Sequence, residues 1–232
     1  MRFLILAPFL AALSLGGQTP APYFIGFLRP NPSRTRLEKS EGDRIQAAHM
    51  ANIQKMAREG VLVSAGPFED TPVTISGIFI FKGISRQAAQ TIADQDPTVV
   101  EHRNTIDVHA WNGPPEIGTE YMRLHTLDPK TPENMQTHPL CIFLHGSAWG
   151  DVAKRESALK AHEVWLGKLR EEGKLGAAGA IEGPDDMQGV AMFKSIPLDE
   201  AQRLVTADPA VTAGVMRPEL HTWWSADHVL PW

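Results

Sequence analysis

The sequence predicts an α+β protein in which the second half of the chain repeats the fold of the first. The main observation is an internal repeat, because Gly77-Ile-Phe-Ile-Phe-Lys82 resembles Gly189-Val-Ala-Met-Phe-Lys194 at a spacing of 112 residues. Further pairs keep the same order at a spacing of 112 or 113: Ala65-Gly66 with Ala178-Gly179, Ala89 with Ala201, Asp96-Pro97 with Asp208-Pro209, and His109-Ala-Trp111 with His221-Thr-Trp223. The second observation is that both copies show the same order of strand and helix patterns. Ordered recurrence at one spacing indicates a duplicated structural unit.

The first copy is assigned to residues 22–112 and begins with an apolar strand at 23–28. A helix is expected at 43–60, because apolar residues recur on the face that carries His49 and a glycine ends the pattern. The elements expected after it are strands at 61–65 and 77–82, a helix at 85–93 capped by Ser85, an Asp-Pro turn at 96–97 and a strand at 102–111.

The second copy is assigned to residues 139–226. Its expected elements are a strand at 140–145, a helix at 152–172 that carries His162, strands at 175–178 and 189–194, a helix at 198–206 and a strand at 215–223. Residues 113–138 contain several prolines and glycines and are expected to form a linker or long loop between the copies.

Each copy therefore has the βαββαβ order of a ferredoxin-like unit. Such a unit carries its helices on one face of the sheet, so the other face must be covered. Two copies in one chain can pack these bare faces together, which gives a single-chain pseudo-dimeric α/β barrel. Trp111, Trp223 and Trp224 are expected to help fill its interior. The chain would then be a monomeric pseudo-dimer, and the sequence leaves any further association open.

Composition narrows the classes of partner and site. The chain has 232 residues, 43% of them hydrophobic and 21% charged, with a formal net charge of −5. No run of Lys or Arg is present, so we expect no nucleic-acid partner and no anionic-membrane partner. Cys141 is the only cysteine and lies in an apolar strand pattern, which excludes an intramolecular disulfide and favours a buried thiol. The histidines show no HxH or HExxH spacing, so no metal site is expected.

The first residues are typical of a secretory signal peptide. Arg2 provides a positive charge, residues 3–15 are almost entirely apolar, and Ser14, Gly16 and Gly17 are small. The apolar run is shorter than the roughly 20 residues of a spanning helix. We therefore assign residues 1–17 to a signal peptide and expect a periplasmic or secreted protein, with no membrane contact after cleavage.

Two histidine–aspartate combinations recur with the repeat and are the candidate catalytic residues. His49 and His162 each lie on an apolar helix face, eleven residues before a glycine. Asp96 and Asp208 each follow the second helix of their copy, which the fold places beside the first helix. A carboxylate beside an imidazole fixes its tautomer and makes a general base. The alternative is a buried hydrogen-bonded pair that ties the two helices together.

The last strand of each copy also carries a histidine, His109 and His221, two residues before a tryptophan. If that face of the strand points into the barrel, these histidines could bind a ligand. The alternative, which the pattern favours, is a polar strand face without a ligand.

These motifs together resemble the YciI-related (YCII) domain family. The resemblance rests on the helix histidines, the glycines after them, the Ala-Gly pairs, Gly77 and Gly189, and the two Asp-Pro pairs. It implies a dimeric α/β-barrel fold with His49–Asp96 and His162–Asp208 as the active-site pairs. One relative removes chloride from a chlorinated hydroxyquinol without a cofactor. Most members have a single domain and no secretion signal, and Ala180 stands here where the first copy has Pro67.

The resemblance therefore implies a cofactor-independent lyase or isomerase that acts on a small organic acid or a hydroxylated ring compound. In that hypothesis His49 and His162 take a proton from the substrate, and Asp96 and Asp208 orient them. The alternative hypothesis is a non-catalytic protein that binds a small ligand or a partner and in which both pairs are structural.

Overall fold

The computed structural model of the protein describes residues 23–71, 73–183, 186–194 and 196–232. The signal peptide assigned to residues 1–17 lies outside this part of the chain. The first repeat contains β1 (Tyr23–Pro30), α1 (Lys39–Arg58), β2 (Leu62–Pro67), β3 (Gly77–Lys82), α2 (Arg86–Asp94), α3 (Pro97–Val100) and β4 (Asn104–Trp111). The second repeat contains β5 (Gln136–His145), α5 (Val152–Glu171), β6 (Leu175–Glu182), β7 (Met187–Phe193), α6 (Leu198–Thr206), α7 (Pro209–Thr212) and β8 (Met216–Ser225).

The α+β fold of two ferredoxin-like repeats is confirmed, and the structure adds three short helices to it. α3 and α7 occupy the places where only an Asp-Pro turn was expected. They form because the aspartate accepts a hydrogen bond from a backbone N–H at its own helix start, while proline fits the first helical position. α4 (Thr119–Leu127) lies inside the stretch expected to be a linker.

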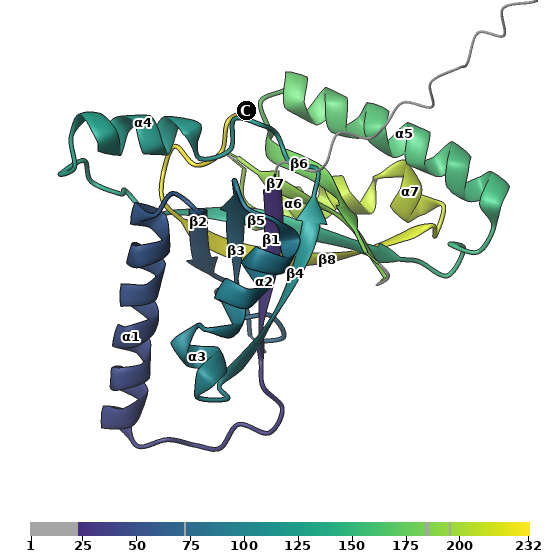
Figure 1. Ribbon diagram of the computed structural model, residues 1–232. Coiled ribbons are helices and arrows are strands. Elements are labelled where there is room, and N and C mark those ends of the chain that lie inside the picture. Colours follow the sequence, from purple (N-terminus) through teal and green to yellow (C-terminus); the bar gives the residue numbers. More distant parts are fainter. Residues whose placement is uncertain (1–22, 72, 184–185, 195) are drawn as a thin grey trace, which may run out of the picture.

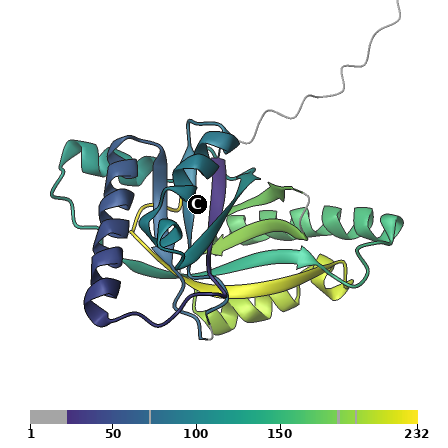
Figure 2. The same cartoon turned by 60° about the horizontal axis from the view of Figure 1, so that its bottom comes forward.

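Within the described residues, eight strands form one sheet in the order β2-β3-β1-β4-β6-β7-β5-β8. The repeats join where β4 pairs with β6, through Ala110 with Glu182 and Trp111 with Ile181. The two ends of the sheet also meet, because Phe68 forms a bridge with Trp223 just beyond β2. The sheet therefore curls into a barrel with two equivalent seams between the repeats. β5 and β8, each of ten residues, run beside one another along the second repeat (Figure 2).

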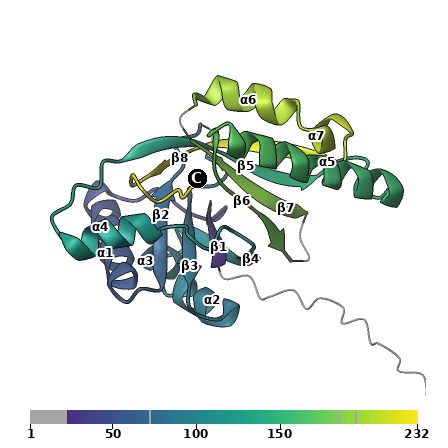
Figure 3. The same cartoon turned by 90° about the horizontal axis from the view of Figure 1, so that it is seen from above.

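The helices of the two repeats cover opposite sides of the barrel. Seen from above, α1, α2 and α3 lie on one side of the strands and α5, α6 and α7 on the other, while α4 lies beside the first repeat (Figures 1 and 3). One cluster of buried side chains fills the interior of the barrel and includes Trp111 and Trp223, which are both fully buried, whereas Trp224 is exposed and does not help fill it. Each half of the sheet also packs against its own helices through one further cluster of buried side chains.

No helix in the described part of the chain has both the length and the apolar character that crossing a membrane requires.

Candidate functional site

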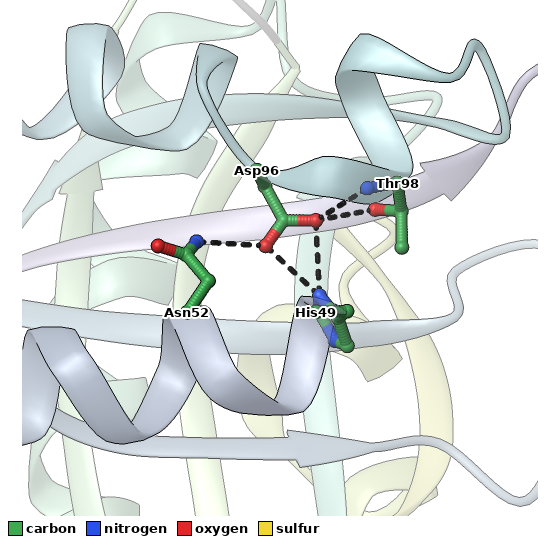
Figure 4. A network of polar contacts seen from close by, with 4 residues as sticks. All are labelled: His49, Asn52, Asp96 and Thr98. Carbon is green, nitrogen blue, oxygen red and sulfur yellow. Dashed lines mark hydrogen bonds and ion pairs between the residues drawn. The ribbon is translucent and has the colours of Figure 1, made fainter. Parts of the chain in front are cut away.

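The first candidate pair joins α1 to the start of α3. Nδ1 of His49 lies 2.9 Å from both carboxylate oxygens of Asp96. The same carboxylate accepts hydrogen bonds from the Asn52 amide at 3.0 Å and from the backbone N–H and hydroxyl of Thr98 at 2.9 and 2.6 Å. Figure 4 shows that these groups converge on Asp96, with His49 and Asn52 coming from α1 and Thr98 from the start of α3. Because Asp96 is fully buried, these hydrogen bonds replace those that its carboxylate would make with water in the unfolded chain.

Two opposing effects set the protonation of Asp96. Burial raises the pKa of its carboxyl group, while hydrogen bonds from His49, Thr98 and Asn52 lower it. The hydrogen bonds outweigh burial, so the pKa of Asp96 lies below its ordinary value of 3.8. Asp96 is therefore ionised at neutral pH and holds His49 with its Nδ1–H toward the carboxylate.

The second candidate pair repeats this geometry with fewer partners. Nδ1 of His162 on α5 lies 2.6 Å from Oδ2 of Asp208, and Oδ1 of Asp208 accepts the Ala210 backbone N–H at 2.9 Å. Trp165 stands where the first repeat has Asn52, and its ring stacks on His162 with centroids 5.6 Å apart. Ala210 replaces Thr98 and offers no hydroxyl. Both aspartates are fully buried, but Asp208 has only two hydrogen-bond donors among the described residues.

A cavity of about 440 Å³ lies beside the second pair. Residues of α5, β6 and β7 form most of its wall, and His162 is one of them. Its aliphatic lining comes from Leu159, Leu166, Leu175, Ala178, Ala180, Ile181 and Met216. The polar side chains of its wall are His162, Glu163, Arg170 and Gln188, and Trp232 lies at its edge. Since Asp208 occupies Nδ1 of His162, Nε2 is the ring nitrogen left for a bound molecule.

The first repeat is different at the corresponding place. A cavity of about 450 Å³ lies at the beginning of α1 and is lined partly by Ser76, Thr98 and Asn104, but His49 is not part of its wall. The His49 side chain is 12% exposed, and its ring stacks on Phe79 with centroids 5.9 Å apart. In the second repeat, His162 is thus part of the wall of a cavity. In the first repeat, His49 is not part of the wall of this cavity.

The two strand histidines are buried at the seams between the repeats. His221 on β8 is 3% exposed, and its Nδ1 lies 2.5 Å from Oδ2 of Asp70, in the loop after β2. Its Nε2 lies 3.2 Å from Glu219, and its ring stacks on Phe68 with centroids 4.5 Å apart. His109 on β4 is also 3% exposed and lies edge-on to Phe27. Neither histidine lines the two cavities described above, and their ligand-binding role stays a prediction.

Other candidate chemistry is limited in the described part of the chain. Cys141 is buried, and burial raises the pKa of its thiol, which keeps the thiol protonated and unreactive. No cluster of three or more His, Cys, Asp or Glu side chains that could hold a metal ion occurs among the described residues.

The sequence model of the YCII-related domain matches residues 24–111 and again residues 121–223. The chain belongs to the YCII-related domain family. The two matches follow the two repeats, and the second one begins inside α4 rather than at β5. A comparison with curated proteins gives no match to this YCII protein.

Solved structures show which fold this YCII protein shares. A candidate chlorite dismutase superposes with a TM-score of 0.55 and 8% identity, covering 88% of this chain and 95% of that one. A mutant of chlorite dismutase from Candidatus Nitrospira defluvii in complex with cyanide gives a TM-score of 0.54 and 10% identity, over 88% and 92%. At these identities the likeness establishes the fold, a dimeric α/β barrel.

Sequence reasoning missed several residues of these sites. Asn52 could have been found, because it lies three positions after His49 on the same helix face. Thr98 could also have been found, since the second residue after a capping aspartate offers it an N–H. Asp70, Arg170 and Trp232 carry no local signal, because their contacts join distant segments of the chain.

Proposed function

We propose that this YCII protein is a cofactor-independent acid–base enzyme whose working site is the cavity beside His162. Asp208 holds Nδ1 of the imidazole, so that Nε2 takes a proton from a small hydroxylated or carbonyl compound in the cavity and later returns one. The observation that carries the proposal is that a single histidine both contacts a buried carboxylate and lines a cavity of about 440 Å³. That volume lies within the range of small-molecule sites.

The walls of the cavity suit this chemistry. Its lining is mainly aliphatic, and surroundings of low polarity strengthen the electrostatic effect of the few polar groups in it. When the imidazole accepts a proton, the neighbouring carboxylate of Asp208 stabilises the positive charge. The reaction class that fits is a lyase or isomerase step that begins with removal of a proton.

For the first repeat we propose a structural role. Asp96 is held by three side chains and a backbone N–H, and the resulting network links α1 to α3 (Figure 4). This arrangement supports the hypothesis of a structural pair for His49 and Asp96, whereas the cavity supports the catalytic hypothesis for His162 and Asp208.

Residues 1–17 remain assigned to a signal peptide, so the enzyme would act in the periplasm or outside the cell. Separating the compartments of an expressing bacterium and sequencing the N-terminus of the exported form would test this assignment. Full-length protein retained in the cytoplasm would contradict it.

The catalytic proposal is tested by proton exchange in D₂O. Phenylpyruvate and pyruvate carry exchangeable C–H bonds next to a carbonyl, and NMR follows the loss of their proton signals. We expect exchange above the buffer rate with wild type, and a drop of roughly 100-fold or more with His162→Ala, since general-base catalysis contributes about 10²–10⁴-fold. His49→Ala is the matched control and should keep exchange within a few-fold of wild type.

Two results would contradict the proposal. One is exchange that survives in the folded His162→Ala variant. The other is a haem complex, detected by a shifted absorption band on titration with haemin and lost in His162→Ala. A histidine whose Nδ1 contacts a carboxylate can also serve as an axial iron ligand, so haemin is included as a probe.

A further inference from the structure

The cavity beside His162 has a wall that the first repeat lacks. Arg170 lies two helical turns after His162 on α5 and is exposed at the cavity, and its guanidinium carbon lies 4.3 Å from the ring centroid of Trp232. Both residues line the cavity. The repeat places Ala57 at the position of Arg170, so the cation belongs to the second site alone.

Trp232 is fixed in this place by the backbone. Its N–H donates to the carbonyl oxygen of Gly176 on β6 at 3.1 Å. Just before it, Leu230 packs against Gly176 so closely that a Cβ there would lie 2.6 Å from Cδ1 of Leu230. The segment after β8 therefore crosses β6 and brings an aromatic ring to the cavity, while Arg170 packs over that ring.

The charges of the cavity wall are separated along α5. Glu163 follows His162 directly and is exposed, whereas Arg170 lies eight residues after His162, about 12 Å along the helix axis. Among the described residues, no carboxylate forms an ion pair with Arg170. A bound anion is attracted to the Arg170 end and repelled from the Glu163 end.

We infer that Arg170 and Trp232 form the anion-binding and ring-stacking end of this cavity, so that its ligand is a small aromatic or unsaturated acid bound with its acidic group at Arg170 and its reactive group at His162. Arginine suits a carboxylate because its planar fork donates two parallel hydrogen bonds. The inference rests on the proposed function for the role of His162, but it assigns residues to binding and orientation instead of to proton transfer.

The test measures binding of two probes of nearly equal shape, 4-hydroxybenzoate and 4-hydroxybenzamide, by calorimetry. Wild type should bind the anion at least tenfold more tightly than the neutral amide. Arg170→Gln should weaken binding of the anion roughly tenfold or more and leave binding of the amide unchanged, because it removes a charge-assisted hydrogen bond. Arg170→Lys should keep part of the preference for the anion over the amide. Trp232→Leu should weaken the binding of both probes.

Lys168→Gln is the matched control, since Lys168 is an exposed cation on the same helix turn and does not line the cavity. The inference is overturned if wild type binds both probes equally or neither, or if Arg170→Gln and Lys168→Gln have the same effect. His162→Ala separates this inference from the proposed function. It should abolish proton exchange while 4-hydroxybenzoate still binds within a few-fold of wild type.

Discussion

A Cβ atom on Gly66 would stand 2.0 Å from the carbonyl oxygen of Trp224. The same contact recurs in the other half of the chain, where a Cβ on Gly179 would stand 2.1 Å from the carbonyl oxygen of Asn112. These glycines lie at the two seams, at which the last strand of one repeat passes β2 or β6 of the other. The glycine of each repeated Ala-Gly pair is therefore a requirement of barrel closure, because any side chain on it would collide with backbone.

Gly66→Ala and Gly179→Ala should each lower the free energy of unfolding by about 1–3 kcal/mol or more, since the collision is with backbone that cannot move aside. Urea denaturation followed by circular dichroism measures this. Gly42→Ala is the control, because Gly42 lies in α1 with nothing within 4 Å of the added Cβ, and it should be neutral or slightly stabilising. Seam variants as stable as wild type would refute the argument.

Asp96→Asn should destabilise the protein by about 3 kcal/mol at pH 7, because it removes a buried charge that three side chains and a backbone N–H stabilise. Asp208→Asn should cost less, since Asp208 has fewer donors. The exposed Asp94→Asn should change stability by less than about 0.5 kcal/mol. An equal loss for Asp96→Asn and Asp94→Asn would contradict the role of the network.

The stability that Asp96 provides should also depend on pH. Its pKa in the folded protein lies below the ordinary value of 3.8, so the unfolded chain binds its proton first as the pH falls. The contribution is complete above about pH 4 and is lost as the pH falls through the lower folded pKa. Chemical denaturation of wild type and Asp96→Asn from pH 7 to pH 2 should therefore show a constant gap that narrows only below about pH 4. A gap that closes near pH 6 would implicate another group.

The Asp70–His221 contact should hold the seam between β2 and β8 closed. Asp70 also accepts the Thr222 backbone N–H at 3.0 Å, so Asp70→Ala breaks two hydrogen bonds across the seam. We expect a loss of roughly 1–3 kcal/mol, with faster hydrogen exchange at the amide of Glu69, which donates to Thr222. Asp107→Ala on β4 is the control, because that side chain is 61% exposed. Exchange at Glu69 that matches the control would exclude this role.

Both helix histidines should be locked in one tautomer. Because Nδ1 of His49 and of His162 faces an aspartate, the neutral rings should carry their proton on Nδ1. Long-range nitrogen–proton NMR correlations distinguish the two tautomers. In Asp208→Asn the preference at His162 should weaken and that at His49 should not, and loss of both together would point to a general structural change.

Much of the fold could be predicted because the same order of strand and helix patterns occurs twice in the sequence. The strand and helix patterns of 77–82 and 85–93 recur in the second half, and the two bare sheet faces leave barrel closure as the natural way to bury them. The strands β1 and β5 extend beyond their predicted ends, and α4 was missed. A local sequence pattern does not show how far pairing with a neighbouring strand extends the end of a strand. It also does not show the packing that lets a proline-rich linker form a helix.

The pairing of each helix histidine with the aspartate of its Asp-Pro pair could also be predicted from the sequence. In a βαββαβ unit the two helices lie side by side, so the end of the second helix approaches the first. What the sequence by itself determined is thus the duplicated unit, the Ala-Gly pairs and the candidate residues of both pairs. Only the tertiary structure decided that a cavity lies at His162, that Arg170 and Trp232 wall it, and that Asp70 holds His221. Asp70 and His221 lie 151 positions apart and meet only because the two repeats close on each other, whereas Gly176 and Trp232 lie 56 positions apart and meet because the segment after β8 folds back over β6.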